Sequence, residues 1–230
     1  MTEAGWLACS DPDLMLEHLR GRRVYDRKLR LFACACCRLV WKWIKDERSR
    51  WAVEYAEHFA DRRAKGHEMA SASRAAFTVI ADFVRELPAS GTTDRDLEIE
   101  INVADAVWRT SNPSSIQGCI LVIAQRTRFT ERHHGEDGGK GAMQSRLLRD
   151  IFGRPHPFPQ VGMNRGWLTA DMVALASSIY EDRAFDRMPI LADALEDGGC
   201  DSAEVLTHCR GSGPHVRGCW VVDLILSKDH

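Results

Sequence analysis

Apolar residues recur at intervals of three and four along most of the chain, which is the period of an amphipathic helix. In segment 26–45 the recurring positions form one stripe, made of Leu29, Phe32, Ala33, Cys36, Val40 and Trp43. Segment 67–87 is rich in alanine and carries Phe77, Ile80 and Val84 on one side. Each of these segments is therefore predicted to be a helix with one buried face.

Residues that begin and end helices support this reading. Pro12 lies in the first turn of a predicted helix that Gly21 ends, and Pro189 lies in the first turn of another. Thr169 is predicted to cap a helix over 170–183. The inward positions of that helix are Met172, Val173, Ala176, Ile179 and Tyr180.

Two segments need a decision between helix and strand. Segment 96–108 alternates at its start, as a strand does, but Leu97, Ile101 and Ala104 also form a helical stripe. We predict a helix, because the chain offers no neighbouring strands. The run 220–226 is apolar apart from Asp223, and we predict that it forms a buried helix that closes the core.

The predicted fold is all-α, a multi-helix orthogonal bundle of about nine or ten helices. Residues 133–141 are rich in glycine and charge, and are predicted to form a flexible loop. This loop separates an N-terminal helical part, 1–132, from a C-terminal helical part, 142–230. The two parts are consistent either with one continuous domain or with two helical subdomains.

Composition and charge narrow the classes of function. The formal net charge of -2 gives no overall attraction to nucleic acid or to an anionic membrane. The residues near the start are acidic, whereas a signal peptide has a basic region there. No apolar stretch is long enough to span a bilayer. We expect a cytoplasmic protein without a membrane partner, in which all eight cysteines stay reduced.

The cysteines raise the alternative of a zinc site. The three thiols of segment 34–37 are spread over nearly half of the helix circumference, so Cys34, Cys36 and Cys37 cannot all bind one ion. Two of them, Cys34 and Cys37, can share a face. The other half of a site would then come from the closing segment.

In the closing segment, Cys209, His215 and Cys219 follow one another at short intervals, and His215 and Cys219 stack if the last helix begins near Pro214. This set lacks the compact spacing of a zinc-finger signature. We therefore favour buried packing of the thiols and no cofactor, with zinc as the alternative.

Catalytic signatures are missing. The chain has no P-loop, no dinucleotide-binding glycine motif, and none of the common metalloprotease or hydrolase motifs. A nucleophile pair of Cys219 with His208 or His215 has no evident third group to orient it. The sequence thus predicts a protein that is not an enzyme.

Basic residues offer two candidate contact sites. Arg22, Arg23, Arg27 and Arg30 form a local patch suited to phosphate or to an acidic partner, although a solvated surface is the simpler reading. Arg210 and Arg217 flank a glycine-rich turn, where they can hold an anion or cap helix ends.

The stretches "DRKLRLFACACCRLVW" and "MPILADALEDGGCDSAEVLTHCRGSGPHVRGCWVVDLIL" resemble an uncharacterised, planctomycete-type family of bacterial proteins. The stretch "LADALEDGG" is also similar to the helix-turn-helix of small repeat-companion domains. The resemblance implies a coherent helical fold and a cytoplasmic setting, and it carries over no catalytic residue. Segment 67–140 departs from the alanine-rich middle of that family.

Three hypotheses follow. The first is a non-enzymatic helical module that binds a protein partner or acts in regulation. The second is a zinc-stabilised helical module. The third is an accessory subunit of a nucleic-acid-associated complex, which contacts phosphate through the local basic patch.

Overall fold

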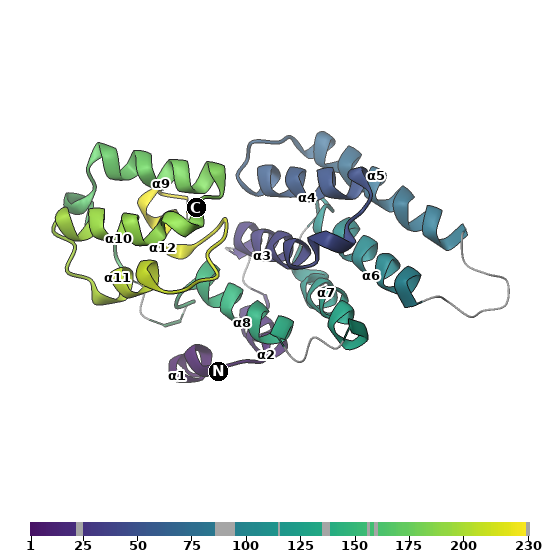
Figure 1. Ribbon diagram of the computed structural model, residues 1–230, viewed down its shortest axis with the longest axis horizontal. Helices are drawn as coiled ribbons and strands as arrows, with labels where there is room; N and C mark the ends of the chain where they lie inside the picture. The colour runs from purple at the N-terminus through teal and green to yellow at the C-terminus, as the bar shows by residue number, and fades with distance from the viewer. Residues whose placement is uncertain are drawn as a thin grey trace. The chain divides into compact units, whose positions relative to one another are not determined.

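The computed structural model describes residues 1–21, 25–85, 95–114, 116–134, 139–155, 157–158 and 161–228. These residues form twelve α-helices and no strand, which confirms the predicted all-α class (Figure 1). Ten of the twelve helices have seven or more residues, and the two shorter ones lie at the ends of the chain. Within the described part, no helix has the length and apolar character that crossing a membrane requires.

The chain divides into two compact units. The N-terminal unit comprises Cys9–Ser145, and the C-terminal unit comprises Met1–Ala8 with Arg146–His230. The predicted loop at 133–141 is helical at both of its described ends, since one helix runs to His134 and the next begins at Gly139. The predicted linker at 88–94 lies outside the described residues.

The N-terminal unit is built from helices of which α3 to α7 pack each against the next, while α2 packs against α7. They are α2 (Pro12–Leu19), α3 (Asp26–Leu39), α4 (Glu47–Ala60), α5 (Gly66–Arg85), α6 (Arg95–Thr110) and α7 (Ile120–His134). Helix α6 confirms the choice of helix over strand for segment 96–108. Helix α3 contacts α4, α6 and α7, so it is the central helix of this unit.

Helix α3 is buried on all sides. The sequence predicts one apolar stripe, but every residue from Leu29 to Cys37 is buried, including Arg30. The difference arises because neighbouring helices cover more than one face of α3, whereas an amphipathic stripe assumes a single covered face.

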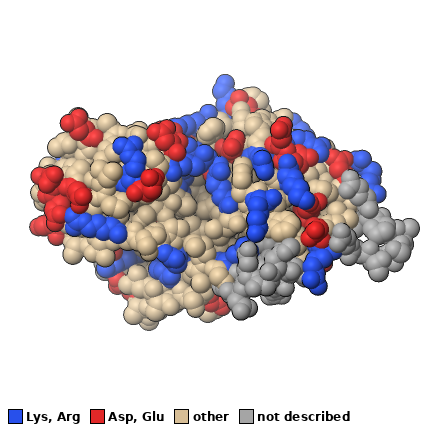
Figure 2. Space-filling model, viewed as in Figure 1, with Lys and Arg blue, Asp and Glu red and all other residues tan. Residues whose placement is uncertain are grey.

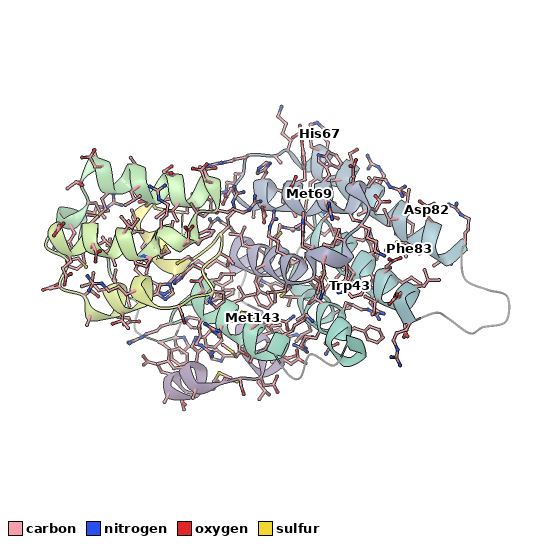
Figure 3. All side chains as sticks on the ribbon, in the orientation of Figure 1. Trp43, His67, Met69, Asp82, Phe83 and Met143 are labelled. Atoms are coloured by element: carbon pink, nitrogen blue, oxygen red, sulfur yellow. The ribbon has the colours of Figure 1, made fainter. Side chains whose placement is uncertain are left out.

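Helix α5 packs through small residues. Its buried positions are Met69, which Figure 3 labels, and Ala72, Ser73, Ala76 and Val79. Phe77 and Val84 of the predicted apolar side are about half exposed, at 50% and 51%. Small side chains let α4 and α6 approach α5 closely, so the larger residues lie at the rim. There the rings of Phe77 and Trp108 are in tilted contact, with 5.2 Å between their centroids.

The three clustered thiols of α3 occupy this interior. Cys34 Sγ lies 3.8 Å from the carbonyl oxygen of Val53, and Cys37 Sγ lies 3.6 Å from the hydroxyl of Thr110. Burial raises the pKa of the Cys37 thiol to about 12 and holds the pKa of Cys34 and Cys36 well above 9.0. These thiols stay protonated in the native protein.

The free energy of unfolding of the N-terminal unit should therefore fall as pH rises from about 9 toward 12. Thiols of the unfolded chain ionise near pH 9 while the native thiols do not, so unfolding releases protons. Each thiol contributes a slope that approaches about 1.4 kcal/mol per pH unit. Urea unfolding under reducing conditions at several pH values measures this dependence of the unfolding free energy on pH.

The Cys37→Ala variant should show a shallower alkaline slope than the wild type. The control is Cys9→Ala, which removes a thiol at a partly exposed position. An unchanged slope in Cys37→Ala would contradict the assignment of the alkaline effect to this thiol.

The C-terminal unit is a second helical bundle. It contains α1 (Glu3–Ala8), the end of α8 (Gly139–Phe152), α9 (Ala170–Asp182), α10 (Met188–Asp197), α11 (Ala203–Arg210) and α12 (Trp220–Ile225) (Figure 1). Thr169 caps α9 as predicted, because its hydroxyl accepts the N–H of Met172. Helix α12 is buried, which confirms the prediction for segment 220–226.

Candidate metal centre

Four side chains of the C-terminal unit converge on one point. Asp150, His208, His215 and Cys219 each offer one ligand atom, and these atoms all lie within 4.8 Å of one another. Two of the donors are imidazole nitrogens, one is a carboxylate oxygen and one is a sulfur. Such a group can hold a metal ion.

Each donor has a different local origin. Asp150 lies in the last turn of α8 and His208 in the last turn of α11. His215 lies in the segment between α11 and α12, and Cys219 is the N-cap residue of α12. Stacking of His215 and Cys219 on one helix face requires a last helix that begins near Pro214, but α12 begins at Trp220, so the two residues do not stack on a helix.

The segment between α11 and α12 is shaped by glycine. Gly213 has a positive φ of 71°, and a Cβ there would come within 2.9 Å of the backbone nitrogen of His215. Arg146 of α8 donates a hydrogen bond to the carbonyl oxygen of Gly213. These contacts set the course of the backbone just before His215.

The carboxylate of Asp150 is the centre of the hydrogen-bond network. Its Oδ1 lies 2.7 Å from His215 Nδ1 and 3.1 Å from His208 Nε2. Its Oδ2 accepts the backbone N–H of Val216 at 3.0 Å. The side chain of Asp150 is only 3% exposed, so its charge is held by these donors rather than by water.

The tautomer of neutral His208 follows from its neighbour Trp220. The indole N–H of Trp220 donates to His208 Nδ1 at 3.1 Å, and an indole nitrogen is only a donor. In this arrangement, neutral His208 carries its proton on Nε2 and points it toward Asp150 and toward Cys219 Sγ, which is 3.2 Å away.

His215 presents a second nitrogen with no hydrogen-bond partner. Its side chain is 6% exposed and its Nδ1 is occupied by Asp150. Its Nε2 is buried, and no described group accepts from it or donates to it.

Opposing effects set the charge of the cluster. Burial raises the pKa of Asp150, but the hydrogen bonds and charges of His208 and His215 together lower it below its ordinary 3.8. Burial, followed by the charge of Asp150, raises the pKa of the Cys219 thiol well above 9.0. The site therefore has an ionised carboxylate beside a neutral thiol when no cation is bound.

A cysteine nucleophile fits these observations poorly. Asp150 provides the third group that the sequence did not reveal for a pair of Cys219 and His208. However, Cys219 has no exposed surface and its thiol is hard to ionise. A nucleophilic cysteine needs an accessible thiolate, which requires the opposite environment.

A cavity of about 600 Å³ adjoins the cluster within the C-terminal unit. Asp150, His208 and His215 line its wall, together with residues of α1, α8, α11 and α12. The ring of Trp220 also lines it and lies against Gly153, where a Cβ would come within 3.0 Å of the indole. The positive φ of Gly153, 54°, likewise favours glycine.

The residues that the sequence singled out for zinc lie in different places. His215 and Cys219 belong to the cluster of four. Cys209 is buried in the apolar core of the C-terminal unit, outside that cluster. Cys34 and Cys37 lie in the other unit, against Val53 and Thr110.

The arginines near the closing turn serve as internal contacts. Arg217 is buried, and it donates to the carbonyl oxygens of Tyr180 and Glu181 in the last turn of α9. Arg210 lies on the surface and pairs with Asp193 at 2.9 Å and with Glu196 at 2.5 Å. Both arginines thus already engage acceptors of their own unit.

The arginines of the basic patch divide into two groups. Arg22 and Arg23 lie outside the described residues. Arg27 pairs with the buried Asp61 at 2.9 Å, and Arg30 is buried against carbonyl oxygens. On the face shown in Figure 2, basic and acidic side chains are interspersed.

The sequence reading proposed neither Asp150 nor His208 as a metal ligand, and it considered His208 only as a partner of Cys219 in a nucleophile pair. Asp150 lies three residues after Leu147 and one before Ile151, and both of these neighbours are buried and apolar. A carboxylate among buried apolar residues is rarely left without a partner, and this was the available signal.

Comparisons with protein-family models, with curated proteins and with solved structures each found no match for this chain.

Proposed function

We propose that the protein is a zinc-stabilised helical module, with the metal held by Asp150, His208, His215 and Cys219. The observation that carries this proposal is the convergence of four donor groups, from two buried and two half-buried residues, within 4.8 Å in the C-terminal unit. The proposed role of the metal is structural, since four protein donors fill a tetrahedral shell and leave no open position.

Donor chemistry favours zinc over other common cations. Imidazole and thiolate donors suit zinc, whereas magnesium and calcium prefer shells made of oxygen. Zinc bonds of 2.0–2.3 Å place neighbouring donors of a tetrahedron about 3.3–3.6 Å apart. Three of the six donor pairs, at 2.7, 3.1 and 3.2 Å, would move slightly apart, while the widest separations, up to 4.8 Å, would have to close on the ion.

Charge balance also supports a divalent cation. Asp150 supplies one negative charge, and Cys219 would supply a second on losing its proton to bind the metal. A doubly positive ion neutralises both, and a neutral group is far less costly to bury than separate charges.

Metal binding at His208 Nε2 requires the proton to move to Nδ1. That nitrogen then no longer accepts from Trp220, so the indole hydrogen bond must break. Zinc binding should therefore change the environment of Trp220, whose fluorescence reports on the site.

Cys219→Ala should lose the metal, and Cys209→Ala should keep it. Both variants remove a buried thiol from the same unit, but only Cys219 belongs to the cluster. We expect about one zinc per chain in the wild type and in Cys209→Ala, since thiolate loss weakens a four-donor site severely. Elemental analysis of the purified proteins measures this.

Equal zinc contents in Cys219→Ala and the wild type would contradict the proposed ligand set. Absence of zinc from the wild type, both as purified and after dialysis against zinc, would refute the function itself.

A further inference from the structure

We infer that helix α1 (Glu3–Ala8) is a latch that opposes metal binding, because its docking holds Trp220 in the position that occupies His208 Nδ1. This inference rests on the proposed zinc function and names a regulator of that same site. All the contacts that carry it lie within the C-terminal unit.

Trp220 is the group that competes with the metal. Its indole N–H donates to His208 Nδ1 at 3.1 Å, and this bond keeps the imidazole proton on Nε2, the nitrogen that zinc needs. When zinc binds Nε2, Nδ1 carries the proton and faces another donor, so the indole has to move away. The Trp220 ring therefore needs one position when it bonds His208 and another when zinc does.

Gly153 fixes the first of these positions. The ring of Trp220 lies so close to the backbone of Gly153 that three of its atoms would come within 3.2 Å of a Cβ there. A displacement of the Gly153 backbone would therefore reach the indole directly.

Helix α1 in turn holds Gly153. The indole N–H of Trp6 donates to the carbonyl oxygen of Gly153 at 2.8 Å, and Trp6 is fully buried. A helix of six residues is not stable by itself, so α1 is either docked through Trp6 or unfolded. Its docking is thus a two-state element that can bias the position of Trp220.

A second contact of α1 leads to the helix that carries His208. Arg154 pairs with Glu3 of α1 at 2.9 Å and with Glu204 at 2.8 Å. Glu204 lies in the first turn of α11, and His208 lies in the last turn. Both contacts of α1 are made in the arrangement in which Trp220 bonds His208, so docking stabilises that arrangement.

Trp6→Phe tests the latch, because phenylalanine keeps a buried ring but cannot donate to Gly153. We expect Trp6→Phe to bind zinc about fivefold more tightly than the wild type, or better, in a competition with a chromophoric chelator. Glu3→Gln weakens the pair with Arg154 and should act in the same direction by a smaller factor. The matched control is Trp51→Phe, the same change at an exposed tryptophan of the N-terminal unit, which should bind zinc as the wild type does.

Trp220→Phe shows whether the effect passes through Trp220. This change removes the indole donor, so zinc should again bind more tightly, and adding Trp6→Phe should bring little further gain. In the wild type, zinc should also speed the hydrogen exchange of the α1 amides, because coupling between two equilibria is reciprocal.

The tautomer of His208 tests the latch without zinc. In protein treated with chelator, the imidazole nitrogen chemical shifts of Trp6→Phe should show more of the form protonated on Nδ1 than those of the wild type. An unchanged tautomer overturns the inference. If the tautomer changes and no variant binds zinc, only the metal is refuted.

Three results with zinc would also overturn the latch. They are a zinc affinity in Trp6→Phe no higher than in the wild type, a gain that persists in full in the Trp220→Phe background, and α1 exchange that zinc leaves unchanged. Because the wild type binds zinc in each of these cases, they refute the latch and leave the proposed function standing.

Discussion

Adding zinc to the metal-free protein should stabilise the C-terminal unit by about 2.7 kcal/mol when free zinc is one hundred times its Kd. The reason is that the four donors come together only in the folded unit, where Asp150 and His215 lie 65 positions apart in sequence. The unfolded chain cannot present that set, so the binding energy adds to the folding energy. Urea unfolding with and without zinc, followed by tryptophan fluorescence, measures the change.

Two comparisons make this result specific. Magnesium at the same concentration should have little effect, because it prefers six oxygen donors. In His208→Ala the zinc-dependent gain should disappear, while a surface substitution in the same unit, such as Arg165→Met, should leave it intact. If zinc does not change the free energy of unfolding of the wild type, a structural metal is ruled out.

Replacing Arg30 by methionine should destabilise the N-terminal unit by about 3 kcal/mol or more. The guanidinium of Arg30 donates to the carbonyl oxygens of Thr110 at 2.8 Å, Asn112 at 2.7 Å and Ser114 at 2.9 Å. These carbonyls lie at and beyond the end of α6, where the helix dipole favours a cation. Methionine keeps the apolar stem but leaves the carbonyls without this donor.

The matched control for Arg30→Met is Arg74→Met, at an exposed position of α5, which should change stability by less than about 0.5 kcal/mol. The same pair of variants examines the hypothesis of phosphate contact through the basic patch. A titration with DNA at two salt concentrations should show no difference between them, since Arg30 points inward. A salt-dependent loss of DNA binding in Arg30→Met alone, with unchanged stability, would instead favour the nucleic-acid hypothesis.

The site was only partly visible in the sequence. His215 and Cys219 stand out because of their spacing in a cysteine-rich segment, and they do belong to the cluster. Cys209 fits the same pattern but faces the apolar core, because the short helix α11 turns it away from its neighbour His208. Spacing alone cannot distinguish these residues, since consecutive positions on a helix point about 100° apart and the covered side depends on packing.

The helical class, the cap at Thr169 and the burial of segment 220–226 were determined by the sequence itself. Each depends on residues within a few positions of one another, so the period of the apolar residues and the chemistry of the cap are sufficient. The meeting of Asp150 with two histidines and a cysteine was decided only by the tertiary structure. It requires the end of α8 to pack against the segment 208–219, which is far from it in the chain, and no local preference specifies that packing.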